Sequence, residues 1–218
     1  MSDTDSFIDE VTEEVRRDKL FATFRKYGWI AVVAVLALVG GAAWREYQKV
    51  QADARSQAFG DAVLAALDKP AGAERVAALA AVEAPNVGGR AVLDMMEAAE
   101  QSSADNPTAA AELLSAIASN GEVPAIYRDI ASFKALSLPG NGQSAEDRRI
   151  GLEALAIPGK PLRLLAEEQL ALIEIEAGET AAAIDRLNAI LVDSEVSAGL
   201  RRRAAQLIVA LGGIPDAG

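Results

Sequence analysis

Residues 166–184 read Ala-Glu-Glu-Gln-Leu-Ala-Leu-Ile-Glu-Ile-Glu-Ala-Gly-Glu-Thr-Ala-Ala-Ala-Ile. On both sides of Gly178, apolar residues recur at intervals of three and four, which places them on one face of an α-helix. Glycine often ends a helix because it adopts a left-handed conformation without steric cost. The stretch therefore predicts two helices joined by a tight turn, with small residues such as Ala171 and Ala182 allowing close packing.

The same alternation of helical periodicity and helix-breaking residues runs through residues 45–218, where no convincing strand pattern occurs. An all-α fold is therefore expected. The loop at 138–142, Leu-Pro-Gly-Asn-Gly, is expected to be the most flexible connection. The predicted helices are 45–68, 71–83, 88–103, 107–119, 124–137, 145–156, 161–177, 180–193 and 196–212.

An internal repeat is visible at a spacing of 73 residues. Ten of 23 positions are identical when 109–131 is placed on 182–204, including Leu114 with Leu187 and Ile117 with Ile190. This spacing is close to two tetratricopeptide units of about 34 residues, and the 166–184 stretch resembles that pattern. The resemblance implies a tetratricopeptide-like helical-hairpin solenoid, and the alternative is an irregular alanine-rich bundle.

The composition excludes several kinds of chemistry. The 218 residues include 46 alanines but no cysteine and no histidine. Disulfides, thiolate zinc sites, cysteine nucleophiles and Ser-His-Asp catalysis are therefore impossible. The net charge of −11 argues against nucleic acid as a partner, because phosphate neutralisation needs an excess of Lys and Arg.

An uncharged stretch of 18 residues covers 27–44. As a helix it would be about 27 Å long, which is close to the apolar thickness of a bilayer. Aromatic and basic residues stand at its ends, where membrane interfaces favour them. The sequence therefore predicts a single transmembrane helix at 27–44, with interface anchors at Tyr27, Trp29, Trp44, Arg45 and Tyr47.

The flanking charges predict the orientation of this span. Five Lys and Arg residues precede it, and fewer follow within a comparable distance. The positive-inside rule then predicts a cytoplasmic N-terminal tail at 1–26 and an external domain at 45–218. A cleaved signal peptide is the alternative, because Gly41-Ala42-Ala43 offers a cleavage site, but the long preceding tail favours an uncleaved anchor.

A more specific resemblance begins where the apolar stretch ends. Gly40-Gly41-Ala-Ala-Trp44-Arg45-Glu-Tyr47 is followed by Gln51, by Ala54-Arg55-Ser56 and by Ala62-Val63. This order is similar to that of the ancillary SecYEG translocon subunits (YfgM-like), which are single-pass, tetratricopeptide-like proteins of Gram-negative inner membranes. By motif, the resemblance rests mainly on residues 40–63.

The resemblance implies a location and a set of partners. We expect an inner-membrane protein with a cytoplasmic N-terminus and a periplasmic C-terminal domain. Its expected partners are Sec translocon subunits and the periplasmic chaperones that receive exported chains. The alanine-rich repeats and the loop at 138–142 depart from the family pattern, which affects the chaperone expectation more than the topology.

Few residues are candidates for a catalytic or binding role. Glu167, Glu168, Glu174 and Glu176 form an acidic group that we interpret as a solvated helix face. The basic run Arg201-Arg202-Arg203 is expected to be neutralised by Glu195 and by neighbouring acidic helices. Met95 and Met96 are interpreted as core residues, with a flexible peptide groove as the alternative. We predict no catalytic, cofactor-binding or metal-binding residue, and the sequence does not identify the partner-binding residues.

These observations favour a membrane-anchored protein–protein interaction module without a cofactor or small-molecule substrate. An envelope-assembly or division adaptor unrelated to Sec is the alternative. A hydrolase that uses carboxylates alone is a remote second alternative, and it would need two facing acids in a cleft with a raised pKa on one of them.

Overall fold

The computed structural model describes the backbone of residues 3–215 and the side-chain surroundings of residues 25–26, 29–30 and 32–215. The chain divides into two compact units, Met1–Gln57 and Ala58–Gly218. Helix α1 (Asp3–Leu67) makes up the first unit and contributes its last ten residues to the second.

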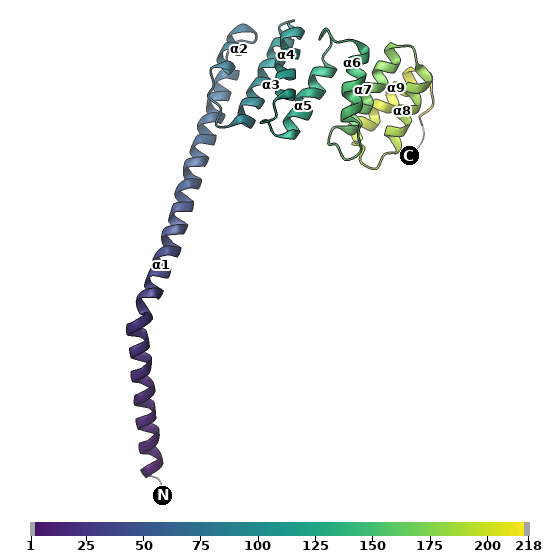
Figure 1. Ribbon diagram of the computed structural model, residues 1–218. Coiled ribbons are helices and arrows are strands. Elements are labelled where there is room, and N and C mark those ends of the chain that lie inside the picture. The colour runs from purple at the N-terminus through teal and green to yellow at the C-terminus, as the bar shows by residue number, and fades with distance from the viewer. Residues whose placement is uncertain (1–2, 216–218) are drawn as a thin grey trace. The chain divides into compact units, whose positions relative to one another are not determined.

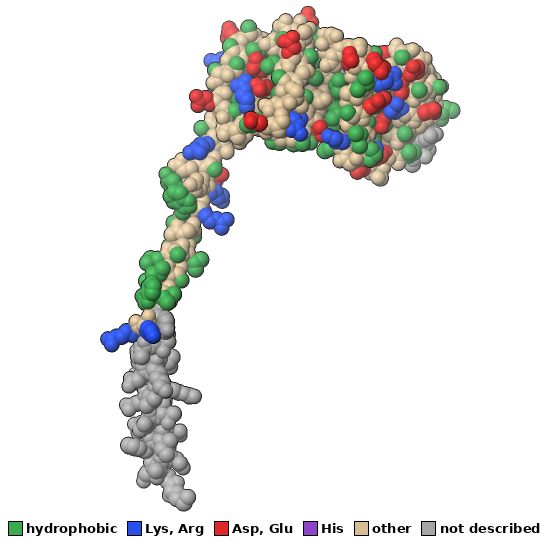
Figure 2. Space-filling model, viewed as in Figure 1, with side chains coloured by type: hydrophobic (Ala, Val, Ile, Leu, Met, Phe, Trp, Pro, Cys, Tyr) green, Lys and Arg blue, Asp and Glu red, His purple; other side chains and the backbone are tan. Residues whose placement is uncertain are grey.

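The first unit is helical throughout its described residues, and the apolar side chains that the structure describes between residues 29 and 50 are exposed (Figure 2). Among the residues that the structure describes, no helix carries an apolar stretch long enough to cross a membrane. The predicted span 27–44 is therefore not supported by the structure. Three of its residues, Tyr27, Gly28 and Ala31, lie outside the set whose side chains are described.

The second unit is built only of helices within its described residues, which confirms the predicted all-α class (Figure 1). Every helix predicted between 71 and 212 is present, and the predicted ends lie within three residues of the observed ones. The helices are α2 (Ala73–Ala80), α3 (Val87–Ser103), α4 (Pro107–Ser119), α5 (Ala125–Ser137), α6 (Ala145–Leu155), α7 (Arg163–Glu176), α8 (Thr180–Val192) and α9 (Ala198–Ala210).

Local sequence signals explain where these helices begin and end. Pro107 occupies the first turn of α4, where its missing N–H has no intrahelical partner to lose. The side chain of Ser144 caps α6, and that of Ser197 caps α9. Gly178 has a φ of +79° in the α7–α8 turn, a value that most residues with a Cβ adopt only with strain.

The 73-residue repeat is present in the fold. A shift of 73 takes Pro107–Ser119 onto Thr180–Val192, and it takes Ala125–Ser137 onto Ala198–Ala210. Equivalent core positions are buried in both halves, including Leu114 and Leu187, Ala110 and Ala183, and Ala131 and Ala204. The structure thus consists of two similar helical layers rather than an irregular bundle.

The core is a series of small clusters along the chain rather than one central core, as expected of a solenoid. Each helix packs mainly on its neighbours in sequence (Figure 1). One cluster joins α3, α4 and α5, a second joins α5, α6 and α7, and a third joins α7, α8 and α9. The end of α1 completes the series by packing Ala66 against Leu79 of α2 and Leu93 of α3.

The loop predicted to be most flexible is held by specific hydrogen bonds. Asn141 is buried at 8% exposure, and its Nδ2 donates to the carbonyl oxygen of Ala135 at 2.7 Å. Its Oδ1 accepts from the backbone N–H of Gln143 at 2.9 Å. The Asn141 side chain thus connects the end of α5 to the loop, because an asparagine amide can both donate to and accept from backbone groups.

Candidate functional site

The predicted interface anchors that the structure describes are all exposed on α1. Trp29, Trp44 and Tyr47 each keep more than half of their surface accessible, and Arg45 is also exposed. The rings of Trp44 and Tyr47 lie 6.3 Å apart, and Gln51 Nε2 donates to the Tyr47 hydroxyl at 3.3 Å. The side chain of Tyr27 lies outside the described residues.

In the second unit, a groove runs between α3 and α5 over the floor that α4 provides. Its volume is about 290 Å³. The walls are mainly apolar and include Met95 on α3 and Phe133 on α5, and Lys134 in the lining is exposed. We call it the α3–α5 groove, and its lining residues are Met95, Ala98, Ala99, Ser102, Leu114, Phe133, Lys134, Ser137, Leu138 and Pro139.

A second groove occupies the equivalent place between α7 and α9, with a volume of about 520 Å³. A bidentate ion pair crosses it, because Arg203 Nε and Nη2 donate to the two oxygens of Glu168, each at 2.7 Å. This bond to Glu168 raises the pKa of Arg203. We call it the α7–α9 groove, and its lining residues are Glu168, Gln169, Leu172, Arg203, Gln206, Leu207 and Ala210.

The two grooves differ at equivalent positions. The 73-residue shift places Met95 on Glu168, and it places Ile130 on Arg203. Phe133 likewise corresponds to Gln206. The first half therefore has apolar groups where the second half has an ion pair and an amide, so the two grooves present different chemical surfaces.

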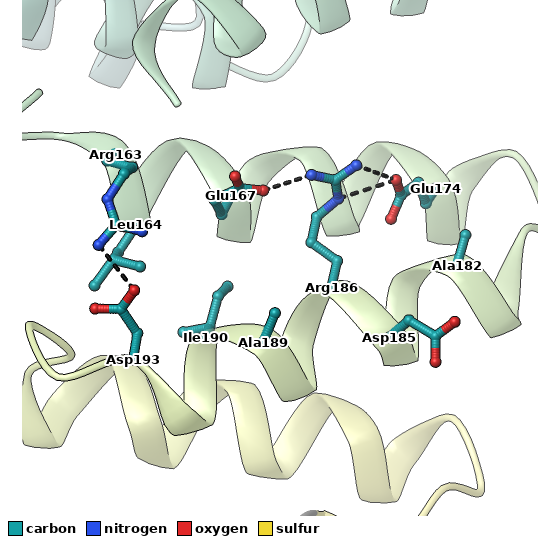
Figure 3. A pocket seen from close by; sticks show the side chains of 10 residues that line it. All are labelled: Arg163, Leu164, Glu167, Glu174, Ala182, Asp185, Arg186, Ala189, Ile190 and Asp193. Carbon is teal, nitrogen blue, oxygen red and sulfur yellow. Dashed lines mark hydrogen bonds and ion pairs between the residues drawn. The ribbon is translucent and has the colours of Figure 1, made fainter. Parts of the chain in front are cut away.

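A third depression, which we call the α7–α8 cleft, lies between α7 and α8 and has a volume of about 480 Å³ (Figure 3). Arg186 of α8 reaches across it to two carboxylates of α7. Its Nε and Nη2 donate to Glu174 Oε1 at 3.0 and 2.7 Å, and its Nη1 donates to Glu167. The pKa of Arg186 is raised, chiefly by its hydrogen bonds to Glu174.

A second ion-pair group closes the other end of this cleft. Arg163 Nη2 donates to Asp193 and to Glu195, both at 2.8 Å. The pKa of Arg163 is raised, first by its bond to Glu195 and then by its bond to Asp193. The pKa of Asp193 is lowered, chiefly because its carboxylate accepts the backbone N–H of Glu195 and then because of Arg163.

The predicted solvated acidic face is wrong for two of its four members. Glu168 and Glu174 are 7% and 3% exposed and are held by arginines of α9 and α8. Glu176 keeps a largely solvent-exposed carboxylate, which pairs with Arg148, and Glu167 is partly exposed and pairs with Arg186. The arginines follow the acidic helix by 12 to 35 residues, so the sequence pattern of α7 alone could not reveal them.

The expected neutralisation of the basic run is confirmed for the neighbouring acidic helix and is wrong for Glu195. Glu195, the predicted counter-charge, pairs instead with Arg163. Glu168 on the neighbouring helix α7 pairs with Arg203, the last residue of the run. Arg201 and Arg202 remain exposed.

The two methionines take different places. Met96 packs in the cluster of α1, α2 and α3, as the core interpretation predicted. Met95 packs against the core of α3, α4 and α5 and also lines the α3–α5 groove. The core interpretation is therefore confirmed for both residues, and Met95 is also placed where the alternative, a peptide groove, would need it.

Comparison with known proteins agrees with this architecture. The sequence model of the family described as tetratricopeptide repeat-like domain matches residues 23–138, just over half of the 218 residues. No curated protein and no solved structure matches the chain. The matched range contains α2 to α5 and nearly all of the α3–α5 groove. The chain belongs to the family of tetratricopeptide repeat-like domains.

Proposed function

We propose that this protein is a membrane-anchored protein–protein interaction module whose α3–α5 groove binds an apolar segment of a partner protein. Membership of the tetratricopeptide repeat-like family supports the general role. Solenoids of stacked helices commonly bind segments of other proteins on an extended surface. The apolar groove within the matched range is the observation that carries the proposal.

The composition of the groove supports an apolar ligand. Met95, Phe133 and Leu138 are half-buried, so each keeps part of an apolar side chain available for contact. A methionine adapts to ligands of different shape because its side chain is unbranched and polarisable. The exposed Lys134 favours a partner segment that carries an acidic residue beside its apolar side chains.

The second half is less suited to this ligand. In the α7–α9 groove, the Glu168–Arg203 ion pair already has its hydrogen bonds satisfied within the chain. An apolar segment placed there would cover the pair and remove Arg203, which is about half exposed, from water. We therefore assign the apolar ligand to the α3–α5 groove.

The anchor is part of the proposal. The uncharged stretch 27–44 with its aromatic ends supports a membrane-spanning segment that places 1–26 in the cytoplasm and 45–218 in the periplasm of an inner membrane. Reporter fusions at residue 10 and at residue 218 test the orientation. Release of the full-length protein from membranes by alkaline carbonate would contradict the anchor.

The partners are proposed from the resemblance at residues 40–63. We propose that the protein associates with Sec translocon subunits and passes exported chains to periplasmic chaperones. Mild crosslinking in intact membranes followed by affinity purification of the full-length protein tests this association. Recovery of Sec subunits that is lost when residues 1–44 are replaced by an unrelated anchor supports it.

The test of the groove uses site-specific photo-crosslinking in the full-length protein. A photoreactive side chain at Phe133 lies inside the α3–α5 groove, and one at Ala116 lies exposed on α4 as the matched control. We expect crosslinks to protein partners from position 133 and few from position 116. Equal crosslinking from both positions contradicts the groove assignment, whichever partner is recovered.

Two other functions would give different results from the proposed one. Recovery of only outer-membrane assembly or division proteins would support a general envelope adaptor unrelated to Sec. A carboxylate-only hydrolase would need a free carboxylic acid facing a second carboxylate. The α7–α8 cleft is a poor candidate, because both of its facing acids, Glu167 and Glu174, are already paired with Arg186.

A further inference from the structure

The α7–α8 cleft has an excess of negative charge. Four carboxylates line it, from Glu167, Glu174, Asp185 and Asp193, against the two guanidinium groups of Arg163 and Arg186 (Figure 3). The lining side chains therefore carry a formal charge of −2. A cleft with one sign of charge in excess attracts ligands of the opposite sign.

One buried carboxylate in the cleft has an unused oxygen. Glu174 is 3% exposed, and its Oε1 accepts both hydrogen bonds from Arg186. Its Oε2 has no hydrogen-bond partner among the described residues. Figure 3 shows this oxygen on the side of the carboxylate that faces α8. A buried acceptor without a donor destabilises the protein, so it is a place where a ligand's N–H gains most.

A second carboxylate marks the mouth of the cleft. Asp185 lies on α8 one residue before Arg186 and is exposed. No ion pair joins Asp185 to another residue in the described part of the chain. It is therefore available to a cation that enters the cleft.

The fold does not require these charges. The 73-residue shift places Gln101 on Glu174, Leu113 on Arg186 and Asn120 on Asp193. The first half thus builds the same helical hairpin with neutral residues at these three positions. Because a buried ion pair seldom stabilises a fold more than neutral packing does, the Glu174–Arg186 pair points to a role beyond holding α7 against α8.

We propose that the α7–α8 cleft binds a single cationic side chain, lysine or arginine, of a partner protein. Its ammonium or guanidinium group donates to Glu174 Oε2 and pairs with Asp185. The cleft is large enough for one such side chain. This proposal rests on the proposed interaction function and adds a polar contact to the apolar segment bound in the α3–α5 groove.

The test uses single-residue probes on the full-length protein in lipid nanodiscs. The probes are Nα-acetyl-lysine methylamide, Nα-acetyl-arginine methylamide and the neutral, similarly shaped Nα-acetyl-norleucine methylamide. Binding is followed by NMR of the methyl groups of Ala182 and Ala189, which line the cleft. We expect the two cationic probes to bind with dissociation constants of about 1–10 mM, and more weakly as salt is added.

Two substitutions in the cleft and one matched control give the expected contrast. Asp185→Asn removes an exposed charge without disturbing Arg186 and should weaken binding about threefold, as expected for one charge near the surface. Glu174→Gln should weaken it about tenfold or more. Glu112→Gln, at the place on α4 that corresponds to Asp185, should change nothing. If Glu174→Gln impairs folding, the Asp185→Asn and salt results decide.

Three outcomes would overturn the inference. The first is that the norleucine probe binds as tightly as the two cationic probes, and the second is that binding is unchanged after Asp185→Asn. The third comes from a separate titration with the free diamine putrescine. If putrescine binds and neither cationic amide does, the ligand is a free amine rather than a protein side chain. Because the probes need no partner protein, these results are independent of the crosslinking from position 133. Crosslinking that persists without probe binding leaves the interaction function in place and rejects only the cleft.

Discussion

At the scale of single residues, Arg186 holds the carboxylates of Glu167 and Glu174, and the second of these has a neutral counterpart, Gln101, in the first half of the repeat. Removing only the arginine leaves Glu174, which is 3% exposed, as an uncompensated buried charge. We expect Arg186→Leu to lower the free energy of unfolding by about 3 kcal/mol. The measurement is urea unfolding of the full-length protein followed by circular dichroism.

The corresponding double substitution is the control. The double variant Glu174→Gln with Arg186→Leu has the same residue types at these two positions as the first half, where Gln101 and Leu113 stand. We expect it to recover most of the lost stability, because no buried charge is then left without a partner. A double variant as unstable as Arg186→Leu alone would mean that the hairpin of the second half needs its ion pairs.

Asn141 is the residue that orders the loop between α5 and α6. Its side chain donates to the carbonyl oxygen of Ala135 at the end of α5 and accepts from the N–H of Gln143 in the loop. We expect Asn141→Ala to destabilise the fold by about 1–2 kcal/mol, because buried backbone groups lose their partners. Asn120→Ala is the control, since Asn120 is exposed and accepts one hydrogen bond from Glu122. Equal losses in thermal unfolding would contradict this role.

At the scale of elements, small residues set the distance between paired helices. Ala98 on α3 and Ala171 on α7 are equivalent in the repeat and almost completely buried. We expect Ala98→Leu and Ala171→Leu each to cost about 1–3 kcal/mol, because a larger side chain forces the helices apart. Ala116→Leu on the exposed side of α4 should stay within about 0.5 kcal/mol. Urea midpoints of the three variants provide the comparison.

The helices could be predicted because periodicity and breakers act locally. The pattern around Gly178 and the Pro107 start depends only on nearby residues, and both agree with the structure. The prediction for α2 was too long at both ends, at 71–83 against Ala73–Ala80, and at the N-terminal end the reason is that Gly72 has a φ of +93°, which does not belong to a helix. Propensity in an alanine-rich stretch does not reveal such a backbone reversal.

The candidate sites were harder to predict from the sequence than the helices. Charged residues on a helix are normally solvated, so the buried state of Glu168 and Glu174 depends on packing with α8 and α9. The repeat at 73 residues carried the missing information. It predicted equivalent helices, and it also identifies Glu174, Arg186 and Asp193 as departures from neutral residues in the first half.

At the scale of the whole molecule, the second unit is stabilised by local clusters joined by ion pairs rather than by one core. Arg75 links α2 to Glu100 of α3, Lys160 links the α6–α7 loop to Asp129 of α5, and Arg163 links α7 to Asp193. Because each layer contacts mainly its neighbours, the loss of one link should loosen one region before the others. The stability of the unit should therefore depend on conditions that change these charges.

Acid is the condition that tests this dependence. The pKa of Glu100 is lowered, chiefly by its hydrogen bond to Arg75, and that of Asp193 is lowered chiefly by the N–H of Glu195. The unfolded chain takes up these protons at higher pH than the folded chain does, so stability should rise with pH through this window. The stabilisation is fully present above the unfolded pKa values and is lost as the pH falls through the folded ones. The fall should therefore begin below about pH 5.

Between about pH 6 and 8, we expect little change in stability, because the sequence contains no histidine. Thermal unfolding of the full-length protein from pH 3 to pH 8 measures the whole profile. Glu100→Gln should flatten part of the acid-side slope, because this side chain then binds no proton in either state. Glu83→Gln, at an exposed position, should leave the slope unchanged. An identical slope in both variants would mean that the link between α2 and α3 contributes nothing to acid sensitivity, and that other carboxylates, Asp193 among them, account for it.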